Sequence, residues 1–398
     1  MKRYALGVDG GTGGIRCQLF DCETGASVAT SERTYETTYG VPHPGYATQE
    51  CEAWWRSFCG AVRELKNSLA LKEKEISLTE DIAAICLDTT CCSVVFMDED
   101  GRSVYPCVMW CDMRAGAKET KDVLNARRRS DGENEKEEED VVAKTLRVNC
   151  DGNGPVSAEW MVPKALWMKR NEREVYERAT KVCEYQDYVN FRLTKRYCAS
   201  ANNVSVRWHF REGKVPPKEL LEALELEDLL EKWPKEVLKC GEVVGNITKE
   251  AFEELFGESA EKKFRDVPVV QGGADAFIGM VGLGAIHPKM MALITGSSHL
   301  HLAVTEKKMY GKGMFGAYEG ALVPEAKFIV EGGQTSTGSI TNWFKEQFNC
   351  TYEDIFKEAE QIPIGCEGLV ALDHFQGNRT PYVDAESKGC FTGLTLKH

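Results

Sequence analysis

Two glycine-rich turns, each between apolar segments of strand-like composition, constrain the fold of this chain more than any other feature. The first turn lies in YALGVDGGTGGIRCQLFD, residues 4–21, and the second in MMALITGSSHLHLAVTE, residues 290–306. Each segment predicts a β-hairpin, because two strand-like runs flank a short turn of small residues. Two parts of the chain that begin alike indicate an internal duplication, although the sequence identity between them is weak.

The length of the chain and the position of the second hairpin predict two domains. At 398 residues the chain exceeds the ~250–300 residues at which single cores usually divide. The pattern changes from polar helices to an apolar, glycine-rich stretch at residues 267–284, directly before the second hairpin. We therefore expect one domain at residues 1–284 and another at residues 285–398. Hydrophobic residues make up 42% of the chain, which is enough for two packed cores.

Charge and composition limit the partners and the compartment of the protein. The net charge of −13 argues against nucleic acid or an anionic membrane surface as the main partner, because both repel an acidic protein. The longest apolar stretch, VVQGGADAFIGMVGLGAI, contains Gln271, Asp275 and several glycines, so it is a poor candidate for a membrane span. The 16 cysteines follow no regular framework, which favours reduced thiols in a cytoplasmic protein. Cys107 and Cys111 lack a second pair of ligands, and we expect no metal–thiolate centre.

Hydrophobic periodicity predicts alternating helices and strands after the first hairpin. A strand-turn-strand unit is expected at residues 82–110, with one strand up to residue 97 and the turn at Asp98–Gly101. Apolar positions at helical spacing predict helices at residues 51–69, 161–179, 185–196 and 216–233. The mixed-charge run at residues 125–147 is interpreted as a solvated insertion without chemistry.

The first turn, DGGTGGIR at residues 9–16, has the composition of an anion-binding loop. Glycines let backbone N–H groups approach phosphate oxygens closely. Asp9 ends the strand at a position where it can hold a magnesium ion or its waters, and Arg16 can neutralise phosphate charge. A Rossmann loop is excluded, because a strand rather than a helix follows the glycines. A plain glycine-rich hairpin without a ligand is the alternative.

The second turn, ITGSSHL, provides the same kind of group from the other part of the chain. Two such turns in equivalent hairpins predict a clamp on a nucleoside triphosphate in a cleft between two domains. This arrangement resembles that of the actin-like ATPases, a superfamily that includes sugar kinases, actin and heat-shock chaperones.

One acid, Asp275, lies in the glycine-rich apolar stretch at the expected domain junction. A carboxylate at that place can accept the proton of a sugar hydroxyl as it attacks the γ-phosphate of ATP. The alternative is a helix N-cap, a position that Asp often occupies. We expect the catalytic role, because the rest of the stretch is apolar.

Together these motifs make the chain similar to the FGGY family of carbohydrate kinases over essentially its whole length. The resemblance rests on GVDGGTGGIRCQLFD, WCDMRA, GGADAF, ITGSS, EGGQTSTGSITNWF and the C-terminal LDHFQGNRTPYVDAESKGCFTGLTL. It implies an α/β fold of two ribonuclease-H-like (actin-like ATPase) domains around an interdomain cleft. The first domain would bind the sugar and the second would bind ATP, with Mg²⁺ as the metal.

The resemblance also implies roles for individual residues. Asp275 becomes the general base, and Asp9 and Asp275 lie near the metal. The phosphates and the rest of the nucleotide are expected to contact Gly11, Thr12, Gly13, Arg16, Gly296, Ser297, Gly338 and Asn342. Trp110 would line the sugar pocket with Asp112 beside it, although core packing is an equal alternative for a buried aromatic ring.

The sugar side departs from the glycerol kinases of the family. Their Arg-Glu pair falls on Thr90 and Cys91 here, which argues against glycerol and makes both positions candidates for contact with a longer sugar. Glu159, on a Gly/Pro-rich loop, and Asp187 are further candidates for binding sugar hydroxyls. For Asp187 a structural role at a helix start fits the sequence equally well. GNRTPY resembles the ribulokinase-like branch, so we expect D-ribulose first and D-xylulose second.

ATP and a small sugar are thus the expected partners, and a homodimer is left open. Two other interpretations remain: an inactive paralogue or sugar sensor without the adenosine site, and a chaperone-like or actin-like assembly protein. WCDMRA and GGADAF argue against the second. The first remains because, in the family, a long helix, a further glycine-rich motif and closing helices follow LDHFQGNRTPY, and none is present here. We therefore expect an incomplete second domain with an uncovered sheet face, and weak or absent ATP binding.

Overall fold

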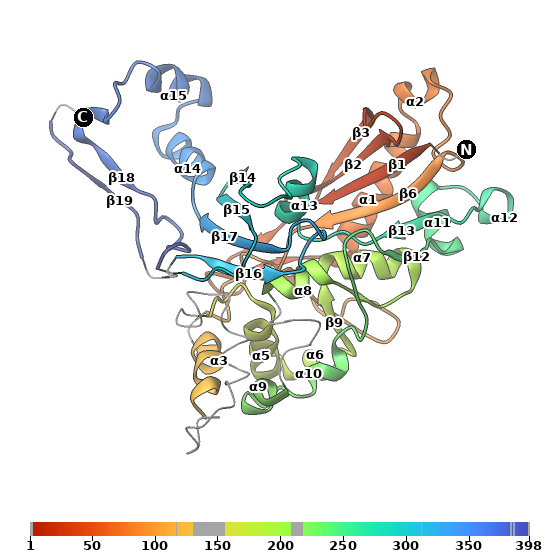
Figure 1. The fold of residues 1–398 in the computed structure, drawn as a ribbon, viewed down its shortest axis with the longest axis horizontal. Helices are drawn as coiled ribbons and strands as arrows, with labels where there is room; N and C mark the ends of the chain where they lie inside the picture. Colours follow the sequence, from red (N-terminus) through yellow and green to blue (C-terminus); the bar gives the residue numbers. More distant parts are fainter. Residues whose placement is uncertain are drawn as a thin grey trace.

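A mixed six-stranded sheet forms the centre of the first part of the protein, in a computed structural model that describes residues 3–116, 118–129, 156–207, 218–311, 313–382, 384 and 387–396. The strand order is β12-β13-β6-β1-β2-β3. β1, β2 and β3 form an antiparallel meander, whereas β6 runs parallel to β1 and β13 runs parallel to β6. The strands are β1 (Tyr4–Gly10), β2 (Gly14–Asp21), β3 (Ser27–Thr34), β6 (Ile82–Thr89), β12 (Val243–Asn246) and β13 (Pro268–Val270). The first predicted hairpin is therefore confirmed (Figure 1).

The strands of this sheet alternate in burial because one face of each strand packs on helices. Leu6 and Val8 of β1 and Ile15, Cys17 and Leu19 of β2 are almost fully buried. The helices of this region are α1 (Cys51–Lys66), α2 (Leu69–Glu73), α7 (Tyr185–Thr194), α11 (Lys249–Phe256) and α12 (Ala260–Lys263). α1 packs on β2 and β3, whereas α7 packs on β6, β12 and β13. The helices predicted at residues 51–69 and 185–196 are thus confirmed, and each is slightly shorter than expected.

A second, antiparallel sheet of the first part has five short strands in the order β4-β5-β8-β7-β9. Its strands are β4 (Thr38–Tyr39), β5 (Ala47–Gln49), β7 (Val94–Met97), β8 (Cys107–Val108) and β9 (Lys181–Glu184). The turn at Asp98–Gly101 is confirmed, but the single strand expected at residues 82–97 is wrong, because β6 and β7 belong to different sheets. The chain turns between them, where Cys92 adopts a left-handed φ of 65° and the N–H of Thr90 donates to the carbonyl oxygen of Gly10.

Helices and a two-stranded sheet complete the first part of the chain. They are α3 (Lys118–Arg129), α5 (Met161–Asn171), α6 (Arg173–Arg178), α8 (Ala201–Arg207), α9 (Lys218–Ala223), α10 (Leu229–Lys232), β10 (Ala199–Ser200) and β11 (Val237–Leu238). The helix predicted at residues 161–179 is divided into α5 and α6. The helix predicted at 216–233 is divided into α9 and α10, because Glu225 between them has a left-handed φ of 54°.

Two of the sequence-based predictions fall partly outside the described residues. The helix predicted at residues 216–233 includes residues 216–217, which are not described. The mixed-charge run at residues 125–147 is described only over residues 125–129, which belong to α3.

The second part of the chain contains an antiparallel four-stranded sheet in the order β14-β15-β17-β16. Its strands are β14 (Met291–Thr295), β15 (His299–Thr305), β16 (Phe315–Glu319) and β17 (Phe328–Gln334). Residues 296–298 form the turn between β14 and β15, so the second predicted hairpin is confirmed. α13 (Asp275–Gly282) precedes this hairpin and lies between it and the six-stranded sheet (Figure 1).

The C-terminal elements extend away from the body of the protein (Figure 1). They are α14 (Gly338–Phe348), α15 (Tyr352–Ala359), the 3-10 helix η2 (Cys366–Gly368), β18 (Val370–Leu372) and β19 (Cys390–Thr392). α14 and α15 bury none of their side chains, and Phe348 and Phe356 are 63% and 58% exposed. Apolar surface is therefore concentrated on this part of the chain.

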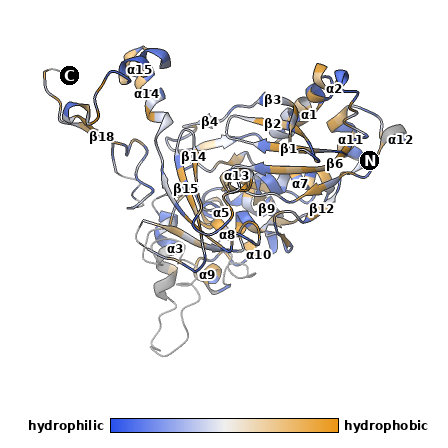
Figure 2. Cartoon of the chain, turned by 45° about the horizontal axis from the view of Figure 1, so that its top comes forward, coloured by the Kyte–Doolittle hydropathy of each residue, from blue (hydrophilic) through white to orange (hydrophobic). Residues whose placement is uncertain are grey.

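Direct contacts join the two expected domains. The rings of Phe277 on α13 and Tyr318 on β16 lie 5.9 Å apart, and β16 packs against α8. Figure 2 shows apolar residues along β6 and α5, which belong to the two neighbouring cores of the first part. The boundary between residues 284 and 285 stays a prediction. Within the described residues, no helix has both the length and the apolar character needed to cross a membrane.

Gly272, directly after β13, is a position where the fold admits no side chain. A Cβ atom there would lie 2.0 Å from the carbonyl oxygen of Leu87 on β6. We predict that Gly272→Ala lowers the free energy of unfolding by about 2–4 kcal/mol, because the segment after β13 must move away from β6. Gly282→Ala is the matched control, since an added Cβ at the end of α13 meets no atom within 4 Å. Chemical denaturation tests this prediction, and equal stability of the two variants would contradict it.

Candidate active site

The turn between β1 and β2 has a fixed backbone and an open tip. The N–H of Gly11 donates to the carbonyl oxygen of Gly14, and the Tyr35 hydroxyl lies 2.5 and 2.9 Å from the carbonyl oxygens of these two glycines. Position 14 requires glycine, because an added Cβ would lie 2.8 Å from the carbonyl oxygen of Arg33. At the tip, an added Cβ on Gly13 would meet no atom within 4 Å. A ligand can therefore approach the backbone at Gly13.

Thr12 connects this turn to the motif WCDMRA. The indole N–H of Trp110 donates to Oγ1 of Thr12 at 3.0 Å, and the side-chain amide of Gln49 donates to the Thr12 carbonyl oxygen at 2.6 Å. Trp110 is partly buried and packs against both apolar cores of the first part of the chain. Two residues predicted for different reactants, the phosphates and the sugar, are therefore direct neighbours.

Three carboxylates gather at one edge of the six-stranded sheet. Asp9 of β1 stands opposite Asp88 of β6 in the parallel register. A β-bridge between Thr89 and Ala274 brings Asp275, the first residue of α13, to the same edge. Asp88 was not predicted from the sequence. The sequence pattern that identified Asp9 could also have identified Asp88, because both are acids near the end of an apolar strand, here IAAICLDTT.

Burial and repulsion by neighbouring acids disfavour the ionised forms of Asp88 and Asp275. The pKa of Asp88 is raised to about 8, first by burial and then by the negative charges of Asp9 and Asp275. The pKa of Asp275 is raised to about 6, chiefly by burial, and the charge of Asp9 acts in the same direction. Nη1 of Arg16 lies 2.8 Å from Oδ2 of Asp9. When all three acids are ionised, one guanidinium cannot neutralise them, and the edge then carries negative charge.

This donor set fits the hard cation expected for a kinase. Carboxylate oxygens are ligands that Mg²⁺ prefers, and Mg²⁺ usually keeps several waters, so it need not contact all three acids. A divalent cation would relieve the repulsion that raises the pKa of Asp88. Asp88 thus joins Asp9 and Asp275 as a candidate metal ligand. Arg16, predicted to face phosphate, also lies 3.3 Å from Glu32.

Asp275 is held at the start of α13 by contacts from α8. The helix begins at Asp275 with Ala274 in the N-cap position, and Oδ1 of Asp275 accepts the N–H of Ala276 at 2.7 Å. Asn202 of α8 is fully buried; its carboxamide oxygen accepts the N–H of Ala274 at 2.8 Å. Its Nδ2 donates to the carbonyl oxygen of Ala321, in the loop after β16, at 2.7 Å. Asn202 therefore ties the start of α13 to both parts of the chain.

Gly296 and Ser297, in the second turn, lie against the start of α14. The N–H of Gly338 donates to the carbonyl oxygen of Gly296 at 3.2 Å, and an added Cβ on Gly338 would lie 2.6 Å from that oxygen. The carbonyl oxygen of Ser297 accepts the N–H groups of the residues on either side of Gly338. Three predicted nucleotide contacts are thus brought together. Asn342 lies about one turn further along α14, where its side-chain amide donates to Glu346 at 2.8 Å.

Asp112 is engaged by the protein itself. Its carboxylate is fully buried and accepts the N–H of Ala47 at 2.6 Å, the N–H of Arg114 at 2.9 Å and two guanidinium N–H groups of Arg114 at 2.9 and 2.8 Å. The guanidinium lies 4.1 Å from the ring centre of Tyr46 and 5.0 Å from that of Trp167. This cluster holds the WCDMRA turn in place. A sugar hydroxyl that donates to Asp112 would have to displace one of these donors.

Thr90 and Cys91 follow the carboxylate edge directly. Thr90 is buried, its N–H donates to the carbonyl oxygen of Gly10 at 3.0 Å, and its Oγ1 lies 2.9 Å from Oγ of Ser93. Cys91 is partly exposed. Both positions therefore lie close to Asp88, at the end of β6.

Glu159 contacts the C-terminal part of the chain. Its Oε1 lies 2.5 Å from Nη2 of Arg379, which belongs to GNRTPY. The neighbouring Thr380 is bound to β17, since its N–H donates to the carbonyl oxygen of Gly333 and its Oγ1 accepts the N–H of Gly333. An ion pair thus joins the loop predicted to bind sugar to the segment that suggested the ribulokinase-like branch.

Asp187 has the structural role that the sequence left as an alternative. It is almost fully buried in the capping box at the start of α7, and its carboxylate accepts the N–H groups of Glu184 and Ser200 at 3.2 Å. Burial raises its pKa well above the usual value for Asp. The helix-start interpretation is confirmed.

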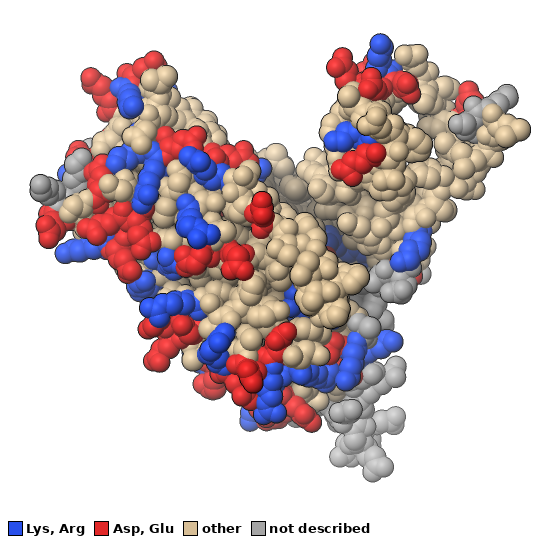
Figure 3. All heavy atoms as spheres, turned by 180° about the vertical axis from the view of Figure 1, so that it is seen from behind, with Lys and Arg blue, Asp and Glu red and all other residues tan. Residues whose placement is uncertain are grey.

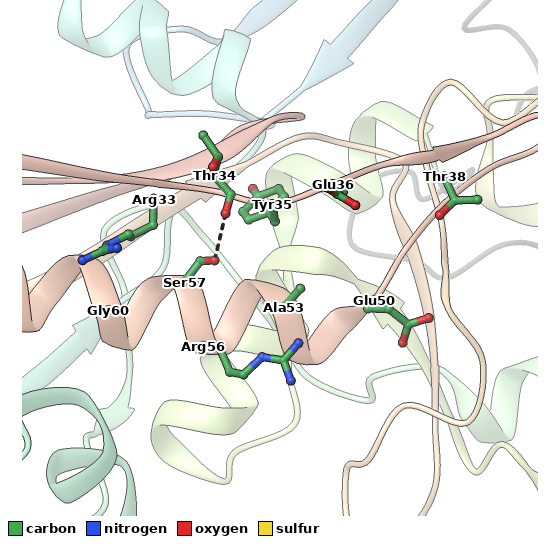
Figure 4. Close-up of a pocket in the computed structure, with 10 residues that line it drawn as sticks. All are labelled: Arg33, Thr34, Tyr35, Glu36, Thr38, Glu50, Ala53, Arg56, Ser57 and Gly60. Carbon is green, nitrogen blue, oxygen red and sulfur yellow. Dashed lines mark hydrogen bonds between the residues drawn. The ribbon is translucent and has the colours of Figure 1, made fainter.

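The surface of the protein has a wide notch. Figure 3 shows this notch between the lobe of the six-stranded sheet and the C-terminal lobe. In Figure 1 α13 and the β14–β15 hairpin lie between these lobes. A separate groove between β3 and α1, with Arg33, Tyr35 and Arg56 among its lining residues, contains none of the predicted site residues (Figure 4).

Comparison with known proteins identifies the family. Residues 4–282 match the N-terminal domain of the FGGY family of carbohydrate kinases, and residues 291–398 match its C-terminal domain. The chain belongs to the FGGY family of carbohydrate kinases. The resemblance seen in the sequence is thereby confirmed, and the protein is a carbohydrate kinase. Kinases of this family use ATP, normally with a divalent metal, so this FGGY kinase has a sugar and ATP as small-molecule partners.

Relatives of this FGGY kinase include enzymes named for two ketopentoses. The xylulose kinase of Lactococcus lactis subsp. lactis (strain IL1403) is 26% identical over 408 residues, which cover 99% of this chain and 72% of the relative. The ribulokinase of Shouchella clausii (strain KSM-K16) is 27% identical over 435 residues, which cover 100% and 72%. The solved structure of ligand-bound xylulose kinase from Lactobacillus acidophilus has a TM-score of 0.77 at 22% identity, covering 99% of this chain and 73% of that chain. The predicted fold of two actin-like ATPase domains is confirmed.

Asp88 is expected to destabilise the metal-free FGGY kinase at alkaline pH. Its pKa is about 8 in the folded protein, whereas Asp in an unfolded chain titrates near ~3.9. The folded state therefore binds the proton more tightly, and this contribution to stability falls as pH rises from about 4 to about 8. We predict that Asp88→Asn raises the free energy of unfolding by on the order of 1–2 kcal/mol at about pH 8 and changes it little at about pH 4.

Denaturant titrations in the presence of a chelator measure this difference. Asp100→Asn, which changes an exposed acid in the turn after β7, is the control and is expected to have no comparable effect. A variant at Asp88 that is less stable than the native protein at the higher pH would show that the three acids do not repel one another.

Proposed function

We propose that this FGGY kinase transfers the γ-phosphoryl group of ATP to a primary hydroxyl of a ketopentose, with D-ribulose as first choice and D-xylulose as second. Relatives named ribulokinase and xylulose kinase, at 25–27% identity, support this substrate class. GNRTPY, which resembles the ribulokinase-like branch, supports the order. Thr90 and Cys91 stand where glycerol kinases carry a charged pair, so glycerol is expected to be a poor substrate.

The observation that carries the proposal is the position of Asp275 at the start of α13, beside Asp9 and Asp88. A pKa of about 6 keeps its carboxylate mostly ionised at neutral pH and still basic enough to accept a proton. The N–H of Ala276 binds Oδ1, which orients the group and leaves Oδ2 for the substrate. Asp275 is therefore assigned as the general base.

The nucleotide is assigned to the two glycine turns and the start of α14. Backbone N–H groups of the turns would donate to phosphate oxygens, and Arg16 would add positive charge. The assigned phosphate contacts are Gly11, Thr12, Gly13, Gly296 and Ser297. Gly338 and Asn342 are assigned to the rest of the nucleotide. On this assignment residues 285–398 supply nucleotide contacts, and residues 1–284 bind the sugar.

The carboxylate edge is assigned to the metal. Asp9, Asp88 and Asp275 would hold Mg²⁺, which when bound would neutralise charge on the phosphate oxygens. These acids lie close to one another without a protein cation for each, as the raised pKa of Asp88 indicates.

The sugar is assigned to the space beside this edge, lined by Thr90, Cys91, Trp110 and Glu159. Asp112 supports this wall through its bonds to Arg114. The Glu159 carboxylate forms an ion pair with Arg379. A sugar hydroxyl that binds to this carboxylate would therefore alter a contact between the two parts of the chain.

In the proposed reaction Asp275 accepts the proton of the attacking hydroxyl. The hydroxyl oxygen then forms a bond to the γ-phosphorus, and the bond from that phosphorus to the bridging oxygen of ADP breaks. Closure of the notch would exclude water, which would otherwise compete with the sugar for the phosphoryl group.

Asp275→Ala is predicted to lower kcat by about 10²-fold or more, because the Ala side chain cannot accept the proton. Sugar affinity, measured by calorimetry, should stay nearly unchanged. Raising the Mg²⁺ concentration should not restore turnover, which separates loss of the base from loss of a metal ligand. Near-normal turnover of a folded variant would show that Asp275 is not the base.

A coupled ADP-release assay over ribulose, xylulose, ribitol and glycerol tests the substrate assignment. We expect the highest kcat/KM with D-ribulose, a lower value with D-xylulose and the lowest with glycerol. A different order would overturn the choice of ketopentose. Sugar binding without ADP release would favour the inactive paralogue or sugar sensor, and a calorimetric titration with ATP would then show whether the nucleotide binds.

A further inference from the structure

Two adjacent cysteines occupy the turn between β6 and β7. The Sγ atoms of Cys91 and Cys92 lie 3.8 Å apart. Neighbouring side chains in a strand point to opposite faces, so two adjacent thiols normally diverge. Here Cys92 has a left-handed φ of 65°, a conformation uncommon for residues other than glycine, and the turn lets the two sulfurs approach.

A buried carboxylate completes this group. Glu184 is the last residue of β9, and the pairing of Val94 with Glu184 brings it next to the turn. The thiol sulfurs and a carboxylate oxygen of Glu184 all lie within 4.8 Å of one another. Among the described residues this is the one set of three or more His, Cys, Asp or Glu side chains that meets this spacing.

The spacing of the sulfurs agrees with tetrahedral coordination. A zinc–sulfur bond of about 2.3 Å and a tetrahedral angle give a sulfur–sulfur separation of about 3.8 Å. This is the separation observed between Cys91 and Cys92. Three protein ligands would leave a fourth coordination position for water or another ligand.

The charges around the group also balance with a divalent cation. Lys164 is fully buried, and its ammonium donates to the carbonyl oxygens of Cys92 at 2.8 Å and of Met109 at 2.6 Å. Two thiolates and one carboxylate carry three negative charges, which a divalent cation and the Lys164 ammonium together neutralise. A buried group of this kind is costly unless its charges are paired.

We propose that Cys91, Cys92 and Glu184 form a binding site for one thiophilic divalent cation of the zinc or cadmium type. Thiolates select such soft or borderline metals, whereas the carboxylate edge at Asp9 and Asp88 suits Mg²⁺. Cys91 is partly exposed, so a cation can reach its thiol from solvent. If the sugar binds beside Cys91, an occupied site slows its phosphorylation, and this consequence rests on the proposed function.

Titration of the reduced, metal-free protein with cadmium tests the site through the ultraviolet charge-transfer absorbance of cadmium thiolates. We expect one tightly bound cadmium ion per chain, which zinc displaces. Cys91→Ser, Cys92→Ser and the double variant should bind cadmium at least about ten-fold more weakly, because the loss of a direct ligand exceeds the effect of an outer-shell change. Cys22→Ser, which removes an exposed thiol in the turn after β2, is the matched control and should bind like the native protein.

Glu184→Gln provides a third readout, because its amide oxygen can still accept the N–H that caps α7. It should weaken cadmium binding while both cysteines remain. Thermal unfolding without metal shows which variants are folded. If a cysteine variant does not fold, the cadmium affinity of Glu184→Gln tests the proposal instead. Unchanged cadmium affinity in a folded double variant, or in the Gln variant when the double variant does not fold, would overturn the proposal. The titration needs no kinase activity, so its failure is distinct from failure of the proposed function.

Discussion

The parallel pairing of β1 with β6, and of β6 with β13, decides where the three acids of the candidate active site lie. Carboxyl ends of parallel strands meet at one edge of a sheet, and ligands bind there in many α/β proteins. The register sets Asp9 opposite Asp88, and the bridge from Thr89 to Ala274 adds Asp275. Backbone hydrogen bonds, rather than attraction between side chains, therefore bring together three acids that repel one another.

This repulsion links the stability of the protein to its function. The raised pKa of Asp88 and Asp275 shows that burial and the neighbouring acids disfavour their ionised forms. The contacts that resist the repulsion lie outside the edge: Arg16 pairs with Asp9, and Asn202 holds the backbone before Asp275. The acids whose repulsion disfavours their ionised forms are the same acids that we propose for cation binding and proton transfer, as is common at catalytic sites.

The turn after β6 adds a second kind of chemistry beside the first. Thr90 and Cys91 leave the six-stranded sheet at the carboxylate edge, and Cys92 redirects the chain into the five-stranded sheet. Hard oxygen donors and soft sulfur donors thus lie on either side of one short segment. The two proposed cation sites differ in the metal that they select, so the cation that binds at one would bind poorly at the other.

Local patterns of glycine and apolar spacing predicted the two hairpins, a helix at residues 51–69 that ends at residue 66 in the structure, the family and most of the candidate site residues. The break at residues 90–93 was not predicted, because it rests on tertiary contacts: Thr90 bonds to the backbone of Gly10 on β1, and Cys92 turns the chain into another sheet. Tertiary contacts also bring Asp88 to the candidate site and Glu184 to the two cysteines. In each case the partners are distant along the chain, and strand register, which no local pattern encodes, brings them together.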